Sequence, residues 1–164
     1  MVQKAFLILL ILLPFVSNSQ NLESIRSQYP KAKESSEITD QMYEELSGVS
    51  GENHVLSAYK GAISALKADF AKGIKNKKDF FKEGAELLDQ AVAAEPENVE
   101  IRYLRLTVQE NAPKIVGYHG NIDEDKEVIK NRFHNLESDS LKAVIRGFIK
   151  ISSNFDKDEK SEFQ

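Results

Sequence analysis

The sequence contains no cysteine and no tryptophan, and it has only eight glycines and four prolines among 164 residues. The absence of cysteine excludes disulfide bridges, thiolate metal sites, cysteine nucleophiles and a lipid-modified N-terminal cysteine. The low glycine and proline content, together with 41% hydrophobic residues, excludes collagen-like and disordered chains. We therefore expect a globular protein, and a single domain is the default at this length.

Positively charged residues are also fewer than negatively charged ones. The 22 lysines and arginines are outnumbered by 26 aspartates and glutamates, which gives a formal net charge of −4. Domains that bind nucleic acid are usually basic. The charge balance therefore argues against a general nucleic-acid-binding protein.

The first twenty residues differ in composition from the rest of the chain. Lys4 precedes an unbroken apolar run from Ala5 to Leu13, and Pro14 follows that run. Ser17 and Ser19 then occupy the −3 and −1 positions of a cleavage site, a layout typical of a secretory signal peptide. The apolar run is shorter than the roughly 20 residues that span a bilayer. We therefore predict cleavage after Ser19 and export to the periplasm or the cell exterior, with a retained anchor or a buried helix as the alternative.

Almost every segment after residue 20 has helical periodicity, and no stretch alternates between apolar and polar residues as a strand does. The clearest pattern places Val55, Tyr59, Ile63, Leu66 and Phe70 on one helix face. The sequence therefore predicts an all-α fold of six or seven helices. Both an antiparallel bundle and a short superhelical stack of helical hairpins fit this prediction.

Prolines, glycines and capping residues set the expected helix limits. We expect a helical domain over residues 20–153 and a flexible charged tail over residues 154–164. The fourth helix has two neighbouring apolar rows, so we expect it to be buried on two sides. In the first half of the chain we expect a helix ending at Pro30, a second capped by Ser35 or Ser36, a third over residues 55–70 and a lysine-rich connection over residues 71–78. A fourth helix is expected from Asp79 to Ala94, a fifth from Asn98 that is closed by Pro113, and then a loop over residues 111–120. The sixth is expected to begin with a capping box of Asn121 and Glu124, and the seventh to be capped by Ser138 or Ser140.

Part of this helical region resembles a tetratricopeptide repeat. Gly84, Leu88, Ala91 and Pro96 stand where the second helix of that repeat has small, large, small and proline residues. Residues 98–106 resemble the turn and the opening of the next first helix. Small residues let two helices approach and large ones fill the gaps between them, so the resemblance implies packed helical hairpins.

Across most of its length the chain also resembles small exported helical proteins of Bacteroidota that have no assigned activity. The likeness rests on the segment before Gln20 and on the stretches Tyr59–Ala62, Glu95–Leu106 and Asn121–Glu127. It implies export and a helical fold, and it assigns no catalytic residue.

The residue patterns of known catalytic and metal sites are missing from the sequence. His54, His119 and His134 are not spaced as metal ligands, and the acidic run from Asp123 lacks the glycine and final carboxylate of a calcium loop. Ser50 lies between glycines in an expected turn, without the preceding strand of a nucleophile elbow. No phosphate loop or dinucleotide fingerprint occurs. We therefore predict no catalytic residue, no cofactor and no metal.

The densest positive patch lies in the expected connection before the fourth helix. One interpretation is contact with anionic lipid headgroups or an acidic polysaccharide. The favoured interpretation is a solvated loop whose charge is largely neutralised by Asp69, Asp79 and Glu83. The patch consists of Lys72, Lys75, Lys77, Lys78 and Lys82, and Phe80 and Phe81 adjoin it.

A second polar group lies on the fifth helix and in the loop after it. Long loops between packed helices often carry function, so this group is a candidate binding surface. The favoured alternative is that an arginine pairs with Asp125 or Glu124 and pins the loop, because a buried charge requires such a partner. The candidate residues are Arg102, Arg105 and Gln109 on one helix face, Tyr118 and His119 in the loop, and Asp125 in the next helix.

These patterns favour an exported, non-enzymatic helical protein that binds another protein or peptide of the cell envelope through a tetratricopeptide-like surface. We expect no transmembrane helix once residues 1–19 are removed, and no nucleic-acid partner. A small hydrolase or carbohydrate-active accessory domain that uses carboxylates or His119 is the second hypothesis. A structural envelope protein without a specific ligand is the third. A deep pocket uniting His119, Arg102 and two acidic residues would favour the hydrolase.

Overall fold

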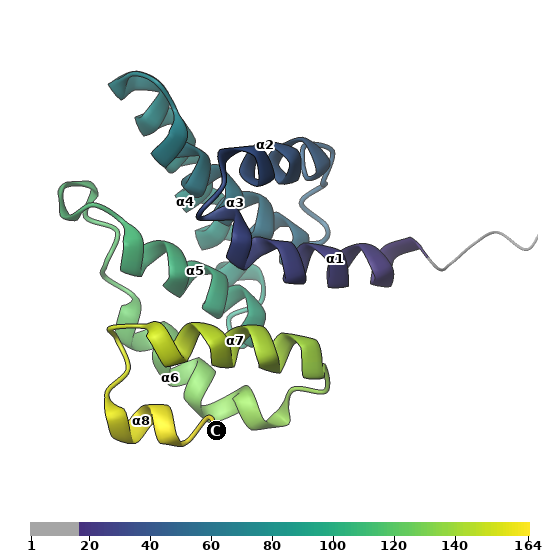
Figure 1. The fold of residues 1–164 in the computed structure, drawn as a ribbon, viewed down its shortest axis with the longest axis vertical. Coiled ribbons are helices and arrows are strands. Elements are labelled where there is room, and N and C mark those ends of the chain that lie inside the picture. Colours follow the sequence, from purple (N-terminus) through teal and green to yellow (C-terminus); the bar gives the residue numbers. More distant parts are fainter. Residues whose placement is uncertain (1–16) are drawn as a thin grey trace, which may run out of the picture.

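The structure is a computed structural model of the chain, and it describes residues 17–164. The predicted signal peptide over residues 1–19 therefore lies almost entirely outside the described residues. Residues 17–164 form eight α-helices and two short 3-10 helices and contain no strand, which confirms the all-α fold (Figure 1). None of these helices is long and apolar enough to cross a membrane. The elements are α1 (Ser17–Ala32), α2 (Ser36–Glu45), α3 (His54–Phe70), α4 (Ile74–Ala94), α5 (Val99–Asn111), η1 (Lys114–Val116), α6 (Ile122–Arg132), η2 (Phe133–Asn135), α7 (Asp139–Ile151) and α8 (Lys157–Ser161).

The helices α3 and α4 form a hairpin with unusually close backbones. A Cβ atom added to Gly84 would lie 2.5 Å from the carbonyl oxygen of Gly61 and 2.7 Å from the backbone nitrogen of Ala65. Only residues without a side chain permit such an approach. The hairpin is therefore specified by the pair Gly61 and Gly84, one on each helix.

The connection between α3 and α4 is much shorter than the sequence predicted. Gly73 has a φ of +82°, which lets the chain turn sharply, and α4 begins at Ile74 instead of Asp79. The predicted lysine-rich connection over residues 71–78 is therefore wrong. Lysine is a good helix former, so the lysine-rich segment continues α4 for one more turn and a half although it has no apolar stripe.

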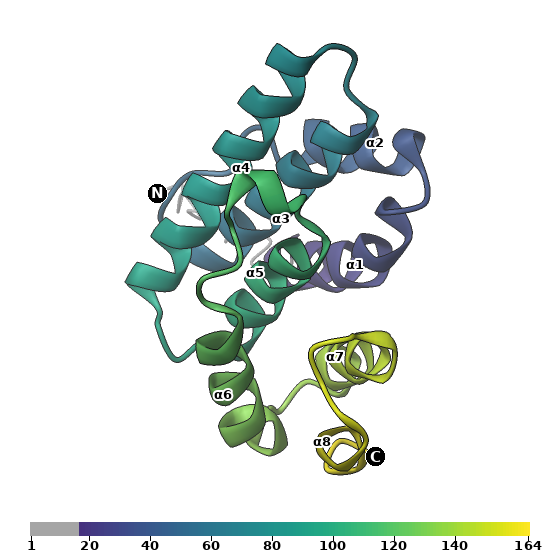
Figure 2. The same cartoon turned by 90° about the vertical axis from the view of Figure 1, so that its left-hand side faces the viewer.

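The central helix of the fold is α5, which packs against α3, α4, α6 and α7 (Figure 2). Every residue from Val99 to Gln109 is buried. The prediction that α4 is buried on two sides is wrong, because its fully buried residues lie on the single face that contacts α3 and α5. These residues are Gly84, Leu88, Ala91 and Val92.

The remaining helix limits follow the capping chemistry with two exceptions. Ser35, Asn98 and Ser138 cap α2, α5 and α7 as predicted. Helix α1 continues past Pro30 to Ala32, because a proline in the last turn removes a single hydrogen bond near the helix end. The capping box expected at the start of α6 is also absent.

At the start of α6 the side chain of Asn121 caps no backbone group. It donates instead to Glu124 over 3.2 Å. The backbone N–H of Asn121 donates to Gln109 over 3.0 Å. This amide therefore has a partner on α5 and leaves no donor for the Glu124 half of a capping box.

The chain end over residues 154–164 differs from the flexible tail that the sequence predicted. It contains α8, and its residues Phe155 and Phe163 are buried. The ring of Phe163 packs edge-on against Phe133, with 5.0 Å between the centroids. Glu159 forms ion pairs with Lys126 and Lys130 at 3.1 and 3.2 Å. Two phenylalanines thus hold a segment whose other residues are mostly charged.

Candidate functional site

The polar group predicted around the fifth helix is assembled on Asp125, a completely buried residue of α6. Its carboxylate accepts one hydrogen bond from Arg102 Nη1 at 2.9 Å and two from Arg105, through Nε at 2.9 Å and Nη2 at 2.7 Å. Gln109 Nε2 donates a fourth at 2.6 Å. Arg102 also pairs with Glu124 at 2.8 Å. The structure therefore contains the arginine–carboxylate pairing that the sequence offered as the favoured alternative.

The loop between α5 and α6 is fastened to this network. Tyr118 donates from its hydroxyl to Asp89 of α4 over 2.9 Å, and its ring meets the Phe81 ring edge-on. Burial, and then the negative charge of Asp89, raises the pKa of Tyr118 well above its usual value. Asp89 also accepts from Arg105 over 3.3 Å. His119 stands apart, because its Nε2 contacts the backbone carbonyl of Ala112 at 3.1 Å and no carboxylate.

The buried polar groups of this network are all paired with one another or with the backbone. Within the described residues no buried side-chain nitrogen or oxygen lacks a hydrogen-bond partner. Burial lowers the pKa of Arg105, but the hydrogen bonds and charge of Asp125 outweigh that effect and raise it, which keeps the guanidinium charged. The role of Asp125 is therefore structural, because it joins α6 and the loop to α5.

A second buried ion cluster was missed by the sequence analysis. Glu100 of α5 accepts two parallel hydrogen bonds from Arg26 of α1, from Nε and Nη2, each at 2.7 Å. The hydroxyl of Tyr59 on α3 donates to the same carboxylate at 2.8 Å. The hydrogen bond with Glu100 raises the pKa of Arg26, and burial raises that of Tyr59. The sequence does indicate that Glu100 is buried, because this residue stands between Val99 and Ile101 in a segment that is apolar on several faces.

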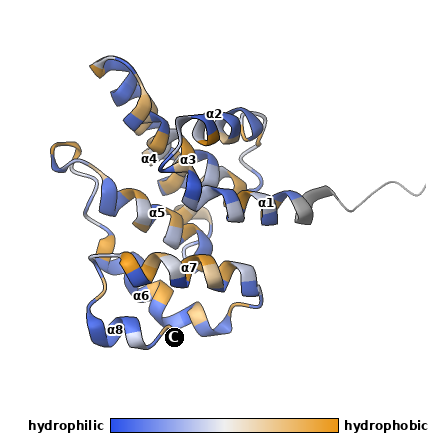
Figure 3. Ribbon diagram, in the orientation of Figure 1, coloured by the Kyte–Doolittle hydropathy of each residue, from blue (hydrophilic) through white to orange (hydrophobic). Residues whose placement is uncertain are grey.

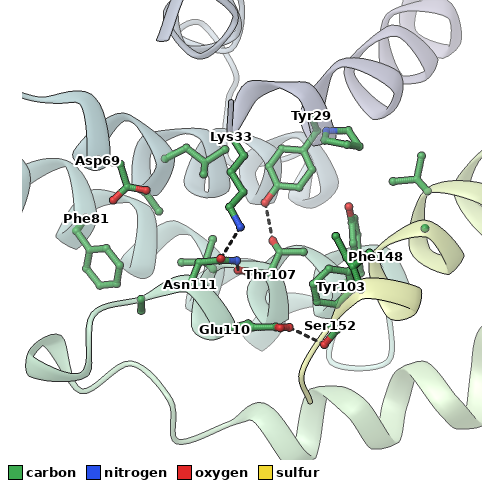
Figure 4. Close-up of a pocket in the computed structure, with 18 of the residues that line it drawn as sticks. Tyr29, Lys33, Asp69, Phe81, Tyr103, Thr107, Glu110, Asn111, Phe148 and Ser152 are labelled. Atoms are coloured by element: carbon green, nitrogen blue, oxygen red, sulfur yellow. Dashed lines mark hydrogen bonds between the residues drawn. The ribbon is translucent and has the colours of Figure 1, made fainter. Parts of the chain in front are cut away.

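A groove of about 460 Å³ lies beside α5 (Figure 4). This volume lies within the range of about 300–1,000 Å³ that is common for ligand sites. The groove opens where the C-terminal ends of α1, α3, α5 and α7 converge. Its lining comprises Tyr29, Pro30, Lys33, Ala65, Leu66, Asp69, Phe81, Tyr103, Thr107, Val108, Glu110, Asn111, Ala112, Pro113, Ala143, Val144, Gly147, Phe148, Ile151 and Ser152.

Most polar side chains of the groove are already paired. Lys33 Nζ donates to Asn111 Oδ1 over 2.6 Å, and the Ser152 hydroxyl donates to Glu110 over 2.6 Å (Figure 4). The carboxylate of Asp69 differs, since it has no hydrogen-bond donor among the described residues. Partial burial raises the pKa of Asp69, while the nearby charges of Lys77 and Lys33 act in the opposite direction.

The groove keeps open space along α7. A Cβ atom added to Gly147 would have no other atom within 4 Å. Neither Arg102 nor His119 lines the groove, so the arrangement that would have favoured a hydrolase is not formed there. Comparison of the chain with protein-family models, with curated proteins and with solved structures finds no match.

Proposed function

We propose that this protein is an exported, non-enzymatic helical module that binds a peptide segment of another cell-envelope protein in the groove between α1, α3, α5 and α7. The observation that carries the proposal is a largely apolar groove of about 460 Å³ with the exposed carboxylate of Asp69 at its rim. The two buried ion clusters on α5 hold the surrounding helices in place. A groove with fixed walls loses less entropy on binding than a mobile one does.

The chemistry of the groove suits a peptide. The aromatic and aliphatic walls at Tyr29, Leu66 and Phe148 match large apolar side chains. A peptide backbone also supplies N–H donors, from which the carboxylate of Asp69 can accept hydrogen bonds. A pure hydrocarbon ligand would offer the Asp69 carboxylate no hydrogen-bond donor.

The α3–α4 hairpin supports a tetratricopeptide-like origin of this architecture. Its turn is only residues 71–73, and its helices touch through Gly61 and Gly84. Pro96 follows α4, and α5 begins three residues later. Helical hairpins of this kind use their grooves to hold extended or helical peptides.

Export is supported by the position of the first buried side chain. Among residues whose side chains are described, burial begins at Ile25, so cleavage after Ser19 leaves the described core unchanged. Cell fractionation and N-terminal sequencing test this part of the proposal. We expect a mature protein that starts at Gln20 in the periplasm or the medium. A cytoplasmic protein that retains Met1 would refute export.

The binding proposal is tested by panning random peptides displayed on phage against the protein and against its Gly147→Leu variant. Gly147 lines the groove, and a Cβ atom added there would have open space around it, so a leucine adds apolar bulk to the groove wall. We expect enriched peptides rich in large apolar side chains that bind the native protein and lose at least tenfold in affinity on Gly147→Leu. Gly147→Ala is the matched control, since it adds one methyl group and should retain binding.

Two measurements accompany this experiment, one of the fold of the variant and one of peptide binding. Circular dichroism of Gly147→Leu should match that of the native protein, because leucine favours a helix more than glycine does. The protein has no tryptophan, so the fluorescence of a tryptophan-containing peptide reports binding without background. Peptides that bind Gly147→Leu as tightly as the native protein, or a library that yields no enrichment, would contradict the proposal.

A further inference from the structure

Large exposed apolar side chains lie along one side of the molecule, at helix ends and in one loop. Phe70 ends α3, Ile74 begins α4, and Ile151 ends α7, while Ile115 and Val116 lie in the loop after α5. Ile74, Ile115 and Ile151 are 87%, 94% and 82% exposed. The ends of α3, α5 and α7 line one groove and therefore converge. We call these five residues the apolar end face.

The pictures agree with this placement. The start of α4, the loop after α5 and the end of α7 all lie at the left of Figure 1. Figure 2 looks onto that side of the molecule. In Figure 3 hydrophobic residues are visible at the start of α4 and in the loop after α5.

Positive charge surrounds this face although the whole chain is acidic. Residues 69–82 contain five lysines and two aspartates. Lys75 pairs with Asp79, whereas Lys72 and Lys78 form no ion pair among the described residues. Lys114 and Lys150 stand beside Ile115 and Ile151 in the sequence. The face therefore alternates exposed aliphatic side chains with ammonium groups.

The lysines at the start of α4 are only partly compensated within the fold. The first turn of this helix has no acidic residue, and no side chain caps it. Lys75 pairs with Asp79 and Lys77 donates to the backbone carbonyl of Asp69, whereas Lys78 forms no ion pair among the described residues. Cations at a helix N-terminus oppose the helix dipole, so Lys78 destabilises the end that it occupies. An external anionic surface would remove this repulsion. Charge and apolar exposure thus point to the same kind of partner.

We propose that the apolar end face docks the protein on an anionic phospholipid bilayer, with Ile74 entering the interface and the lysines of α4 contacting the headgroups. This inference goes beyond the peptide-binding proposal and does not depend on it. Burial of aliphatic side chains and attraction of basic residues to anionic lipid are the two contributions that hold peripheral proteins on membranes. The α3–α4 turn supplies both, and it projects from the body of the molecule (Figure 1).

The test is sedimentation of the protein with vesicles of phosphatidylglycerol and phosphatidylcholine in equal parts, compared with vesicles of phosphatidylcholine alone. We expect binding to the anionic vesicles that falls on adding salt. Lys78→Glu should weaken binding at least fivefold, since one lysine near such a surface contributes about that factor. Ile74→Ser should weaken it by a similar factor.

The matched control is Lys142→Glu. Lys142 also lies in the first turns of its helix, α7, and also forms no ion pair among the described residues, but it is at the end of α7 opposite to Ile151. The two charge reversals therefore change net charge equally, and only Lys78→Glu should reduce binding. All variants share the same N-terminus, so any contribution of residues 1–19 cancels.

A fluorescent variant locates the contact. Ile74→Trp introduces the only tryptophan of the chain, and its emission should shift to shorter wavelength on anionic vesicles. An unchanged emission, equal binding to phosphatidylcholine alone, or equal effects of Lys78→Glu and Lys142→Glu would overturn the inference. Gly147→Leu should keep vesicle binding and Ile74→Ser should keep peptide binding, so the two proposals fail separately.

Discussion

The substitution Asp125→Asn tests the anchoring of α6 to α5. It preserves the shape of the side chain but removes its charge, and it places an amide nitrogen where an oxygen now accepts hydrogen bonds. Arg102 and Arg105 are both buried and would lose their shared carboxylate. Gln109 would lose its acceptor at 2.6 Å.

The magnitude follows from the partners that remain. Removing one member of a buried ion pair costs about 3–5 kcal/mol. Arg102 keeps Glu124 and the carbonyl of Pro96, and Arg105 keeps Asp89 at 3.3 Å. These residual contacts place the expected loss of unfolding free energy near the lower end, about 3 kcal/mol. For a chain of this size that lowers the melting temperature by about 6–12 °C.

Urea unfolding monitored by circular dichroism measures this difference. Glu124→Gln is the control, because Glu124 contacts the same arginines but its side chain is 55% exposed. Exposed ion pairs contribute about 1 kcal/mol or less, so this variant should change stability little. The reasoning is refuted if Asp125→Asn loses less than about 1 kcal/mol, or if Glu124→Gln loses as much as Asp125→Asn.

Three further predictions concern the hairpin, the chain end and pH. Gly84→Ala should destabilise the protein by about 1–2 kcal/mol, because its Cβ would meet the backbone of Gly61, whereas Gly147→Ala should stabilise it by about 0.5–1 kcal/mol; urea unfolding of both variants decides. Phe163→Ala should cost about 3–5 kcal/mol, measured in the same way, and a frayed chain end would give no loss. The hydrogen bond from the backbone of Asp156, and then the nearby lysines of α6, lower the pKa of Glu159 from 4.5 to about 2. The resulting stability is present above pH 4.5 and disappears as the pH falls through about 2, so Glu159→Gln should flatten the decline of melting temperature across that interval; an unchanged decline contradicts it.

Helices with a strong local pattern were predictable from the sequence. The limits of α3, α5 and α7 follow from apolar spacing and from capping residues such as Asn98 and Ser138, which act within one turn. The first turns of α4 were not predictable in this way, because a lysine-rich segment has no apolar stripe. The chain end was missed for a related reason. Phe155 and Phe163 are separated by charged residues, and one key contact, Phe133, comes from another helix.

The contacts of the candidate site also differ in whether a local sequence pattern predicts them. Pairing of the α5 arginines with Asp125 was predictable, because a buried charge demands a nearby opposite charge. The contacts of Glu100 with Arg26 and Tyr59 span 74 and 41 residues and have no local pattern. The groove arises where four helix ends converge, so its lining is a property of tertiary packing. Periodicity places Phe148 on an apolar face but does not show that the residue lines an open groove.

The most direct test of the groove as the binding site is amide chemical-shift mapping by NMR, using a peptide that panning enriches on the native protein. We expect the largest shifts at groove residues on α5 and α7, including Thr107, Asn111 and Gly147. These shifts should be absent in Gly147→Leu. Shifts concentrated on α2 or α6, or an unchanged pattern in Gly147→Leu, would contradict the account.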